Sequence, residues 1–221
     1  ITFESILYNH YQVPLDASLD KRARLIEDHQ FGYLSTRQSH PALEALRALR
    51  EEIVKRTMLS TFEKMLQPLK AKLNYLATGY FHKGYETPML AAGKLSGFDT
   101  ILAGNGTESS TLYGAHKAGR LFIQTGAEVV ETSLMGGDEV VSAYGELKKA
   151  TPDIAELAEW GESALKNNHG PAATLIAWQA GTLCHLLGLY PSAQEAFDAA
   201  REILRQGTAY DKLMRYIDQC R

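Results

Sequence analysis

The feature that most constrains the fold is a succession of strand, helix and strand patterns between residues 73 and 103. Leu73 to Thr78 has the pattern of a buried strand, Gly84 to Leu95 that of a helix, and Thr100 to Ala103 that of a second buried strand. This spacing is typical of a βαβ unit, in which two parallel strands are joined by a right-handed crossover. The sequence therefore predicts an α/β fold with flanking helices on a central sheet that is mostly parallel.

Patterns on either side of this unit extend the prediction. Residues 121–125 and 127–134 are rich in β-formers and are separated by Gly126, which favours a hairpin or a sheet edge. Residues 31–34 form a short apolar run of strand type. Residues 41–66 predict two successive helices that end before Pro68. From Asp138 to the C-terminus the hydrophobic spacing is helical, which predicts a C-terminal helical cluster.

Composition narrows the class of protein. The 221 residues are 45% hydrophobic and 22% charged, with a net charge of −3, so no global attraction to nucleic acid or to an acidic membrane is expected. No run of about 18 apolar residues is present, so we expect no membrane span. Cys184 and Cys220 have no metal or redox spacing, which favours a reducing, cytoplasmic location. Because the chain begins with Ile1 inside a helical pattern, we expect that upstream residues are missing.

The most suggestive polar segment runs from Gly104 to Thr111, directly after the second strand of the βαβ unit. Ligands of open α/β sheets bind beyond the carboxyl ends of the strands. The glycines, Gly106 among them, allow close backbone approach, hydroxyls such as those of Thr107 and Ser109 donate to phosphate oxygens, and Glu108 can hold Mg²⁺. The alternative is a polar turn in which Glu108 is merely solvated.

A second candidate is a basic region. Residues 53–72 contain five basic side chains against Glu63 alone, a local charge of 5 − 1 = +4. This pattern is typical either of a solvated helix face or of phosphate contacts, for which Lys55, Arg56, Lys64 and Lys70 are the candidates. Arg50 and Arg56 are candidate anion anchors, because a guanidinium holds a carboxylate or phosphate through two parallel hydrogen bonds. The alternative is an intrachain ion pair with Glu51 or Glu52.

Read in order, these segments resemble the anthranilate phosphoribosyltransferase family of the glycosyltransferase type-3 group over nearly the whole chain. Each motif is weak alone, and their shared order and spacing carry the resemblance. The matching segments are Leu15-Asp16-Ala17-Ser18, Phe31-Gly32-Tyr33-Leu34, His40-Pro41, Leu49-Arg50-Glu51-Glu52, Arg56-Thr57, Gln67-Pro68-Leu69, Gly104 to Ser110, Gly170-Pro171-Ala172, Ala196 to Ala200, and Gly207.

The resemblance implies a small all-α domain and a large α/β domain. Residues 1–40 would begin the α/β domain, residues 41–70 would add a helical hairpin to the small domain, and residues 71–221 would complete the α/β domain. Enzymes of this family transfer the 5-phosphoribosyl group from phosphoribosyl pyrophosphate to an aromatic amine, in tryptophan biosynthesis to anthranilate, with Mg²⁺. Arg50 falls on the position that holds the anthranilate carboxylate, and Glu108 on one member of the metal-binding acidic pair. A homodimer is implied as well.

Three departures limit this inference. The family's Gly-Thr-Gly-Gly-Asp and Lys-His-Gly-Asn segments, which bind pyrophosphate and ribose, are absent and would precede Ile1, so the isolated chain is predicted to be inactive. Thr107 stands where the acidic partner of Glu108 is expected. The run from Thr61 to Pro68 is two residues longer than its family counterpart and resembles a paralogue group that binds nucleic acids. The alternatives are therefore a non-catalytic protein that binds single-stranded nucleic acid through its basic helix, or a scaffold that only dimerises.

Overall fold

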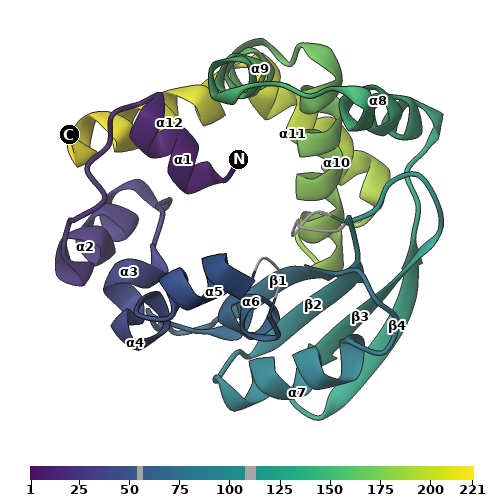
Figure 1. Ribbon diagram of the computed structural model, residues 1–221. Coiled ribbons are helices and arrows are strands. Elements are labelled where there is room, and N and C mark those ends of the chain that lie inside the picture. The colour runs from purple at the N-terminus through teal and green to yellow at the C-terminus, as the bar shows by residue number, and fades with distance from the viewer. Residues whose placement is uncertain (54–56, 108–112) are drawn as a thin grey trace. The chain divides into compact units, whose positions relative to one another are not determined.

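The computed structural model describes residues 1–53, 57–107 and 113–221 (Figure 1). The chain forms two compact units, of which the first combines Ile1–Ser39 with Gly137–Arg221 and the second is His40–Gly136. The assignment of residues 41–70 to a separate small all-α domain stays a prediction.

The second unit contains a four-stranded mixed sheet in the order β1-β2-β3-β4. Its strands are β1 (Tyr75–Tyr80), β2 (Thr100–Asn105), β3 (Gly119–Thr125) and β4 (Glu128–Leu134). β1 and β2 pair in parallel, as predicted, whereas β2 with β3 and β3 with β4 pair antiparallel. The expectation of a mostly parallel sheet is therefore wrong. For β3 and β4 the reason is local, because only residues 126–127 separate them and Gly126 has φ +61°, a connection suited to a hairpin.

The βαβ unit is completed by α7 (Glu86–Leu95), which crosses from the end of β1 to the start of β2. α7 buries Met89 and Leu90 against the sheet, where they join Ile101 of β2 and Phe122 of β3 in one hydrophobic cluster. The same cluster includes Met65 of the preceding 3₁₀ turn. This packing fixes the carboxyl ends of β1 and β2 at one edge of the sheet.

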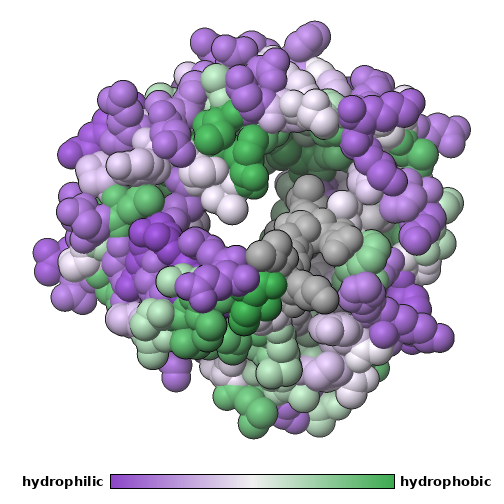
Figure 2. Space-filling model, viewed as in Figure 1, coloured by the Kyte–Doolittle hydropathy of each residue, from purple (hydrophilic) through white to green (hydrophobic). Residues whose placement is uncertain are grey.

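The other helices of the second unit are short: α4 (Pro41–Glu44), α5 (Arg47–Ile53), α6 (Leu59–Phe62) and η1 (Glu63–Met65). A turn at residues 45–46 interrupts the first of the two helices predicted in this region. Leu46, Leu49 and Ile53 follow one another at spacings of three and four residues and are 36%, 53% and 46% exposed. Hydrophobic surface is visible over α5 and α6 in Figure 2. α5 thus presents an apolar stripe to solvent.

In the first unit the described elements are all helices: α1 (Phe3–Asn9), α2 (Leu19–His29), α3 (Thr36–Ser39), α8 (Asp138–Lys149), α9 (Ile154–Asn167), α10 (Gly170–Leu186), α11 (Ala193–Arg205) and α12 (Thr208–Cys220). One core joins the two ends of the chain, because Leu7 of α1 and Leu25 of α2 pack with Tyr216 and Ile217 of α12. A second core lies among α9, α10 and α11. The predicted C-terminal helical cluster is confirmed.

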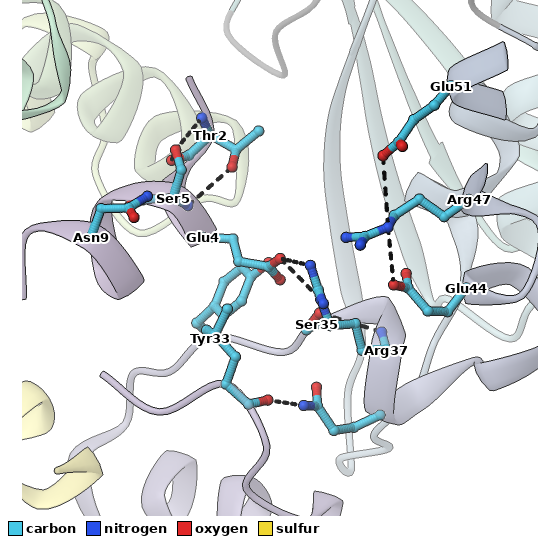
Figure 3. Close-up of polar contacts among 12 residues, drawn as sticks. Thr2, Glu4, Ser5, Asn9, Tyr33, Ser35, Arg37, Glu44, Arg47 and Glu51 are labelled. Atoms are coloured by element: carbon cyan, nitrogen blue, oxygen red, sulfur yellow. Dashed lines mark hydrogen bonds and ion pairs between the residues drawn. The ribbon is translucent and has the colours of Figure 1, made fainter. Parts of the chain in front are cut away.

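Residues 31–34 do not form the short strand that their apolar character suggested. Tertiary packing on α12 replaces strand pairing, since the Phe31 and Tyr216 rings lie 5.2 Å apart and nearly perpendicular. The amide of Tyr33 donates to the Tyr216 hydroxyl at 3.0 Å. The Tyr33 hydroxyl donates to Glu4 at 2.8 Å, and Figure 3 shows both residues. In the described part of the chain, no helix combines the length and the apolar character that crossing a bilayer requires.

Candidate functional site

The carboxyl ends of β1 and β2 lie side by side, because the register pairs Tyr80 with Asn105. The amide of Gly106 donates to the Tyr80 carbonyl at 2.7 Å and prolongs this pairing by one residue. Gly106 is buried and Thr107, the next residue, is half-buried. The sheet edge expected to bind a ligand therefore exists, although the amide of Gly106 is already used by the strand.

A cavity of about 530 Å³ opens at this edge, and we refer to it as the strand-end cavity. Residues from the end of β1, the start of α7, the end of β2 and the start of β3 line it. They are Tyr80, Lys83, Glu86, Asn105, Lys117, Ala118, Gly119 and Arg120. The volume lies within the range of about 300–1,000 Å³ found for small-molecule sites.

Arg120 fixes the wall of the strand-end cavity through two carboxylates. Its guanidinium pairs with Glu131 on β4 through distances of 2.5 and 2.9 Å and with Glu86 at 3.3 Å. It also lies over the Phe122 ring, 4.7 Å from the centroid. Glu86 is buried and accepts a second hydrogen bond from the amide of Gly84 at 2.7 Å. The Arg120 guanidinium and the Glu86 carboxylate are thus both engaged by contacts within the protein.

Tyr80 contributes a neutral hydroxyl to the strand-end cavity. Burial, together with the negative charge of Glu86, raises the pKa of Tyr80 to about 12. The hydroxyl therefore stays protonated at neutral pH, and it donates to the Arg120 carbonyl at 3.4 Å. The side-chain amide of Asn105 donates to the Phe81 carbonyl at 3.3 Å, which leaves its own carbonyl oxygen as an acceptor.

Arg50, the predicted carboxylate anchor, lies on α5 and makes intrachain contacts. Its guanidinium is 2.6 Å from a carboxylate oxygen of Glu63 and donates to the Ser60 hydroxyl at 2.9 Å. The sequence had offered Glu51 or Glu52 as intrachain partners, and the structure shows Glu63 instead. Arg50 does not line the strand-end cavity. Its role toward a substrate stays a prediction.

Only some of the remaining predicted site residues fall in the described part of the chain. Glu108 and Ser109, and likewise Lys55 and Arg56, lie outside the described residues. Lys64 lies 3.5 Å from the Gly79 carbonyl, and Lys70 is exposed. Within residues 1–53, 57–107 and 113–221, no cluster of three His, Cys, Asp or Glu side chains suitable for a metal ion is present.

Sequence reasoning missed the lysines of the strand-end cavity. Lys83 lies in the connection between β1 and α7, and Lys117 lies just before β3. The rule that ligands bind beyond the carboxyl ends of strands was applied to the end of β2 alone. Applied to β1 as well, it would have indicated Lys83. Lys117 has no such signal, because only the antiparallel return of β3 brings it to this edge.

Comparisons with known proteins agree with this architecture. The family model described as "Glycosyl transferase family, a/b domain" matches residues 7–210. Anthranilate phosphoribosyltransferase of Thermus thermophilus is 28% identical over 207 residues, which are 93% of this chain and 60% of the relative. The Deinococcus radiodurans enzyme of the same name is 23% identical over 207 residues, with coverage of 92% and 60%. The chain thus spans about 60% of the length of the curated relatives it matches.

Two solved structures share the fold. The crystal structure of anthranilate phosphoribosyltransferase from Thermus thermophilus aligns with a TM-score of 0.74 at 24% identity, covering 98% of this chain and 64% of the other. The Saccharomyces cerevisiae enzyme in complex with PRPP and Mg aligns with a TM-score of 0.78 at 16% identity, covering 98% and 62%. At these identities the likeness concerns the fold alone. The match over residues 7–210 identifies the family, and the chain belongs to the glycosyl transferase family, a/b domain.

Proposed function

We propose that this chain is part of a phosphoribosyltransferase that transfers the 5-phosphoribosyl group from phosphoribosyl pyrophosphate to an aromatic amine such as anthranilate. The observation that carries the proposal is the family match over residues 7–210, which includes nearly all of both units. The similar fold of the yeast enzyme, which is in complex with PRPP and Mg, supports the choice of donor.

In this proposal the protein contributes positioning and charge. Arg50 holds the acceptor carboxylate, since its planar guanidinium matches a carboxylate through parallel hydrogen bonds. Glu63 now occupies this guanidinium at 2.6 Å, so an acceptor carboxylate has to compete with it. Thr107 and Ser109 would donate hydroxyl hydrogen bonds to phosphate oxygens. Such prearranged contacts lower the barrier for phosphoribosyl transfer without a covalent role for the protein.

Mg²⁺ belongs to the proposal only through Glu108, which lies outside the described residues. Among the described residues that line the strand-end cavity, the carboxylate is that of Glu86, and it is bound to Arg120 and to the amide of Gly84. Thr107 offers a hydroxyl where a second acidic ligand was expected. The described residues therefore do not by themselves fit a magnesium site, and no step of the proposed mechanism depends on the ion.

The test measures anthranilate binding to the 221-residue chain by isothermal titration calorimetry. Arg50→Ala is expected to weaken binding at least about tenfold, because a charged hydrogen bond contributes roughly 1.5–3 kcal/mol. Glu63→Gln is expected to strengthen it, because the competing charge is removed while the side-chain shape is kept. Arg47→Ala is the matched control on the same helix. Arg47 pairs with Glu44 at 3.5 Å and with Glu51 at 3.7 Å (Figure 3), and its removal should leave the affinity unchanged.

A turnover assay completes the test. The 221-residue chain is expected to release no pyrophosphate from phosphoribosyl pyrophosphate and anthranilate, and turnover by it would contradict this prediction. If no aromatic amine binds, while a single-stranded oligonucleotide binds in a salt-sensitive manner that weakens in Lys64→Ala and Lys70→Ala, the nucleic-acid alternative replaces the transferase. Equal effects of Arg47→Ala and Arg50→Ala would also count against the proposed anchor.

A further inference from the structure

The strand-end cavity carries positive charge that the carboxylates of the described residues do not neutralise. Its lining contains Lys83, Lys117 and Arg120 against Glu86, a charge of +3 − 1 = +2. The nearby Glu131, bound to Arg120, reduces this to +1. Both lysines are exposed, and neither ammonium group has an ion pair with a carboxylate of the described residues. The free charge of the cavity therefore resides on the two lysines.

The fixed groups around these lysines exclude a cation as the occupant. Glu86 is buried and is bound to Arg120 and to the amide of Gly84, so it has little remaining capacity for a metal ion. Bringing a cation beside two ammonium groups is also repulsive. An anion, in contrast, is attracted by the two ammonium groups, and the long lysine side chains can adjust their positions to it.

Neutral polar groups share the cavity with the lysines. The Tyr80 hydroxyl is largely buried and the Asn105 carbonyl oxygen remains available, so both can meet hydroxyl groups of a ligand. A volume of about 530 Å³ exceeds what an inorganic anion needs and suits a small phosphorylated molecule. The combination of two free ammonium groups with neutral hydrogen-bonding partners is typical of a site that binds a sugar phosphate.

We propose that the strand-end cavity binds a phosphorylated small molecule of sugar-phosphate size, with its phosphate group between Lys83 and Lys117. This site does not rest on the proposed transferase function, because it uses neither Arg50 nor Glu108. It also uses neither Thr107 nor Ser109, the residues proposed above to contact phosphate oxygens. The chain would thus possess a phosphate site between Lys83, which follows β1, and Lys117, which precedes β3.

The experiment titrates ribose 5-phosphate into the 221-residue chain by calorimetry, with ribose and inorganic phosphate as the two partial probes. Ribose 5-phosphate is expected to bind more tightly than phosphate, and ribose is expected not to bind. The double substitution Lys83→Ala with Lys117→Ala should weaken binding at least about tenfold, as expected for the loss of charge-assisted hydrogen bonds. Raising the salt concentration should weaken wild-type binding as well.

Lys94→Ala is the matched control, because Lys94 is an exposed lysine in the last turn of α7 and lines a different cavity. Its substitution should leave ribose 5-phosphate binding unchanged. Thermal melting checks that all variants fold, which the exposure of these lysines favours. Absence of binding, salt-independent binding, or an equal loss in Lys94→Ala overturns the inference. Anthranilate binding through Arg50 would be unaffected by such a failure, so the two proposals are tested separately.

Discussion

Gly104 makes room for a buried aromatic ring. The glycines of residues 104–106 were interpreted as positions that let the backbone approach a bound molecule. A Cβ atom added to Gly104 would lie 2.4 Å from Cδ1 of Tyr113, whose ring is buried and whose hydroxyl donates to the Leu102 carbonyl at 3.1 Å. Because Gly104 has no side chain, the Tyr113 ring can pack directly on the backbone of β2.

Gly104→Ala is expected to destabilise the protein by about 1–3 kcal/mol, the usual range for overpacking a closed core. Tyr113 cannot move aside easily, because its ring is enclosed and hydrogen-bonded. Chemical denaturation measures the effect. Gly145→Ala on α8 is the control, since no atom lies within 4 Å of the added Cβ, and it should stabilise the protein by about 0.5–1 kcal/mol. Similar effects of the two substitutions would refute this account.

Arg50 illustrates what sequence alone could not settle at the candidate site. Its identity indicated an anchor for a substrate carboxylate or phosphate, and that role stays a prediction. In the structure its guanidinium contacts the carboxylate of Glu63, which follows α6 and lies outside α5. Helical spacing predicts contacts only between near neighbours such as Arg50 with Glu51 or Glu52. It contains no information on partners from a different helix.

At the scale of elements, strong periodicity was predictive and short apolar runs were not. The βαβ unit, the hairpin after Gly126 and the C-terminal helices follow the sequence pattern closely. Residues 31–34 looked like a strand, but Phe31 and Tyr33 instead contact Tyr216 of α12. The sheet is mixed because β3 runs antiparallel to β2 and the short turn at Gly126 returns β4 antiparallel to β3. Short segments are decided by distant partners, which a local pattern does not contain.

Contacts of Glu4 join α1 to residues 33–37 of the same unit (Figure 3). Burial alone would raise the pKa of Glu4, but hydrogen bonds from Ser35 and Tyr33 and the charge of Arg37 together lower it below its ordinary value of 4.5. The stabilisation is therefore present above that ordinary value and is lost as the pH falls through the lowered pKa of the folded state.

Glu4→Gln is expected to lower the Tm at pH 7 by roughly 2–4 °C, the shift that about 1 kcal/mol produces in a chain of this size. The difference from wild type should shrink as the pH is lowered below 4.5 and through the lowered pKa of the folded state, because the wild-type carboxylate then becomes protonated. Thermal melting followed by circular dichroism at several pH values measures both effects. Glu27→Gln, at an exposed carboxylate of α2, is the control. A pH-independent difference would contradict this interpretation.

At the scale of the whole molecule, the apolar stripe of α5 bears on assembly. Leu46, just before α5, and Leu49 and Ile53 within it are exposed, and the homodimer implied by the family resemblance would cover such a surface. A two-fold dimer places the same stripe of both copies in contact, so a single substitution acts twice. The homodimer remains a prediction, and the stripe supplies a direct way to examine it.

Leu49→Glu combined with Ile53→Glu is expected to raise the dimer dissociation constant at least about tenfold, because each buried apolar side chain contributes roughly 1.5–3 kcal/mol. Sedimentation velocity over a concentration series measures it. Leu95→Glu, at a leucine of α7 that is 89% exposed, introduces the same charge elsewhere in the unit and should not change assembly. A monomeric wild-type chain would refute the predicted dimer, and an unchanged dimer in the double variant would exclude this surface.

The core shared by α1, α2 and α12 has a consequence for the order in which the protein is made. Leu7 and Leu25 leave the ribosome long before their partners Tyr216 and Ile217. The continuous stretch His40–Gly136 is complete well before those partners are added. The sheet can therefore form during translation. The apolar side chains of α1 and α2 stay uncovered until α12 has been synthesised.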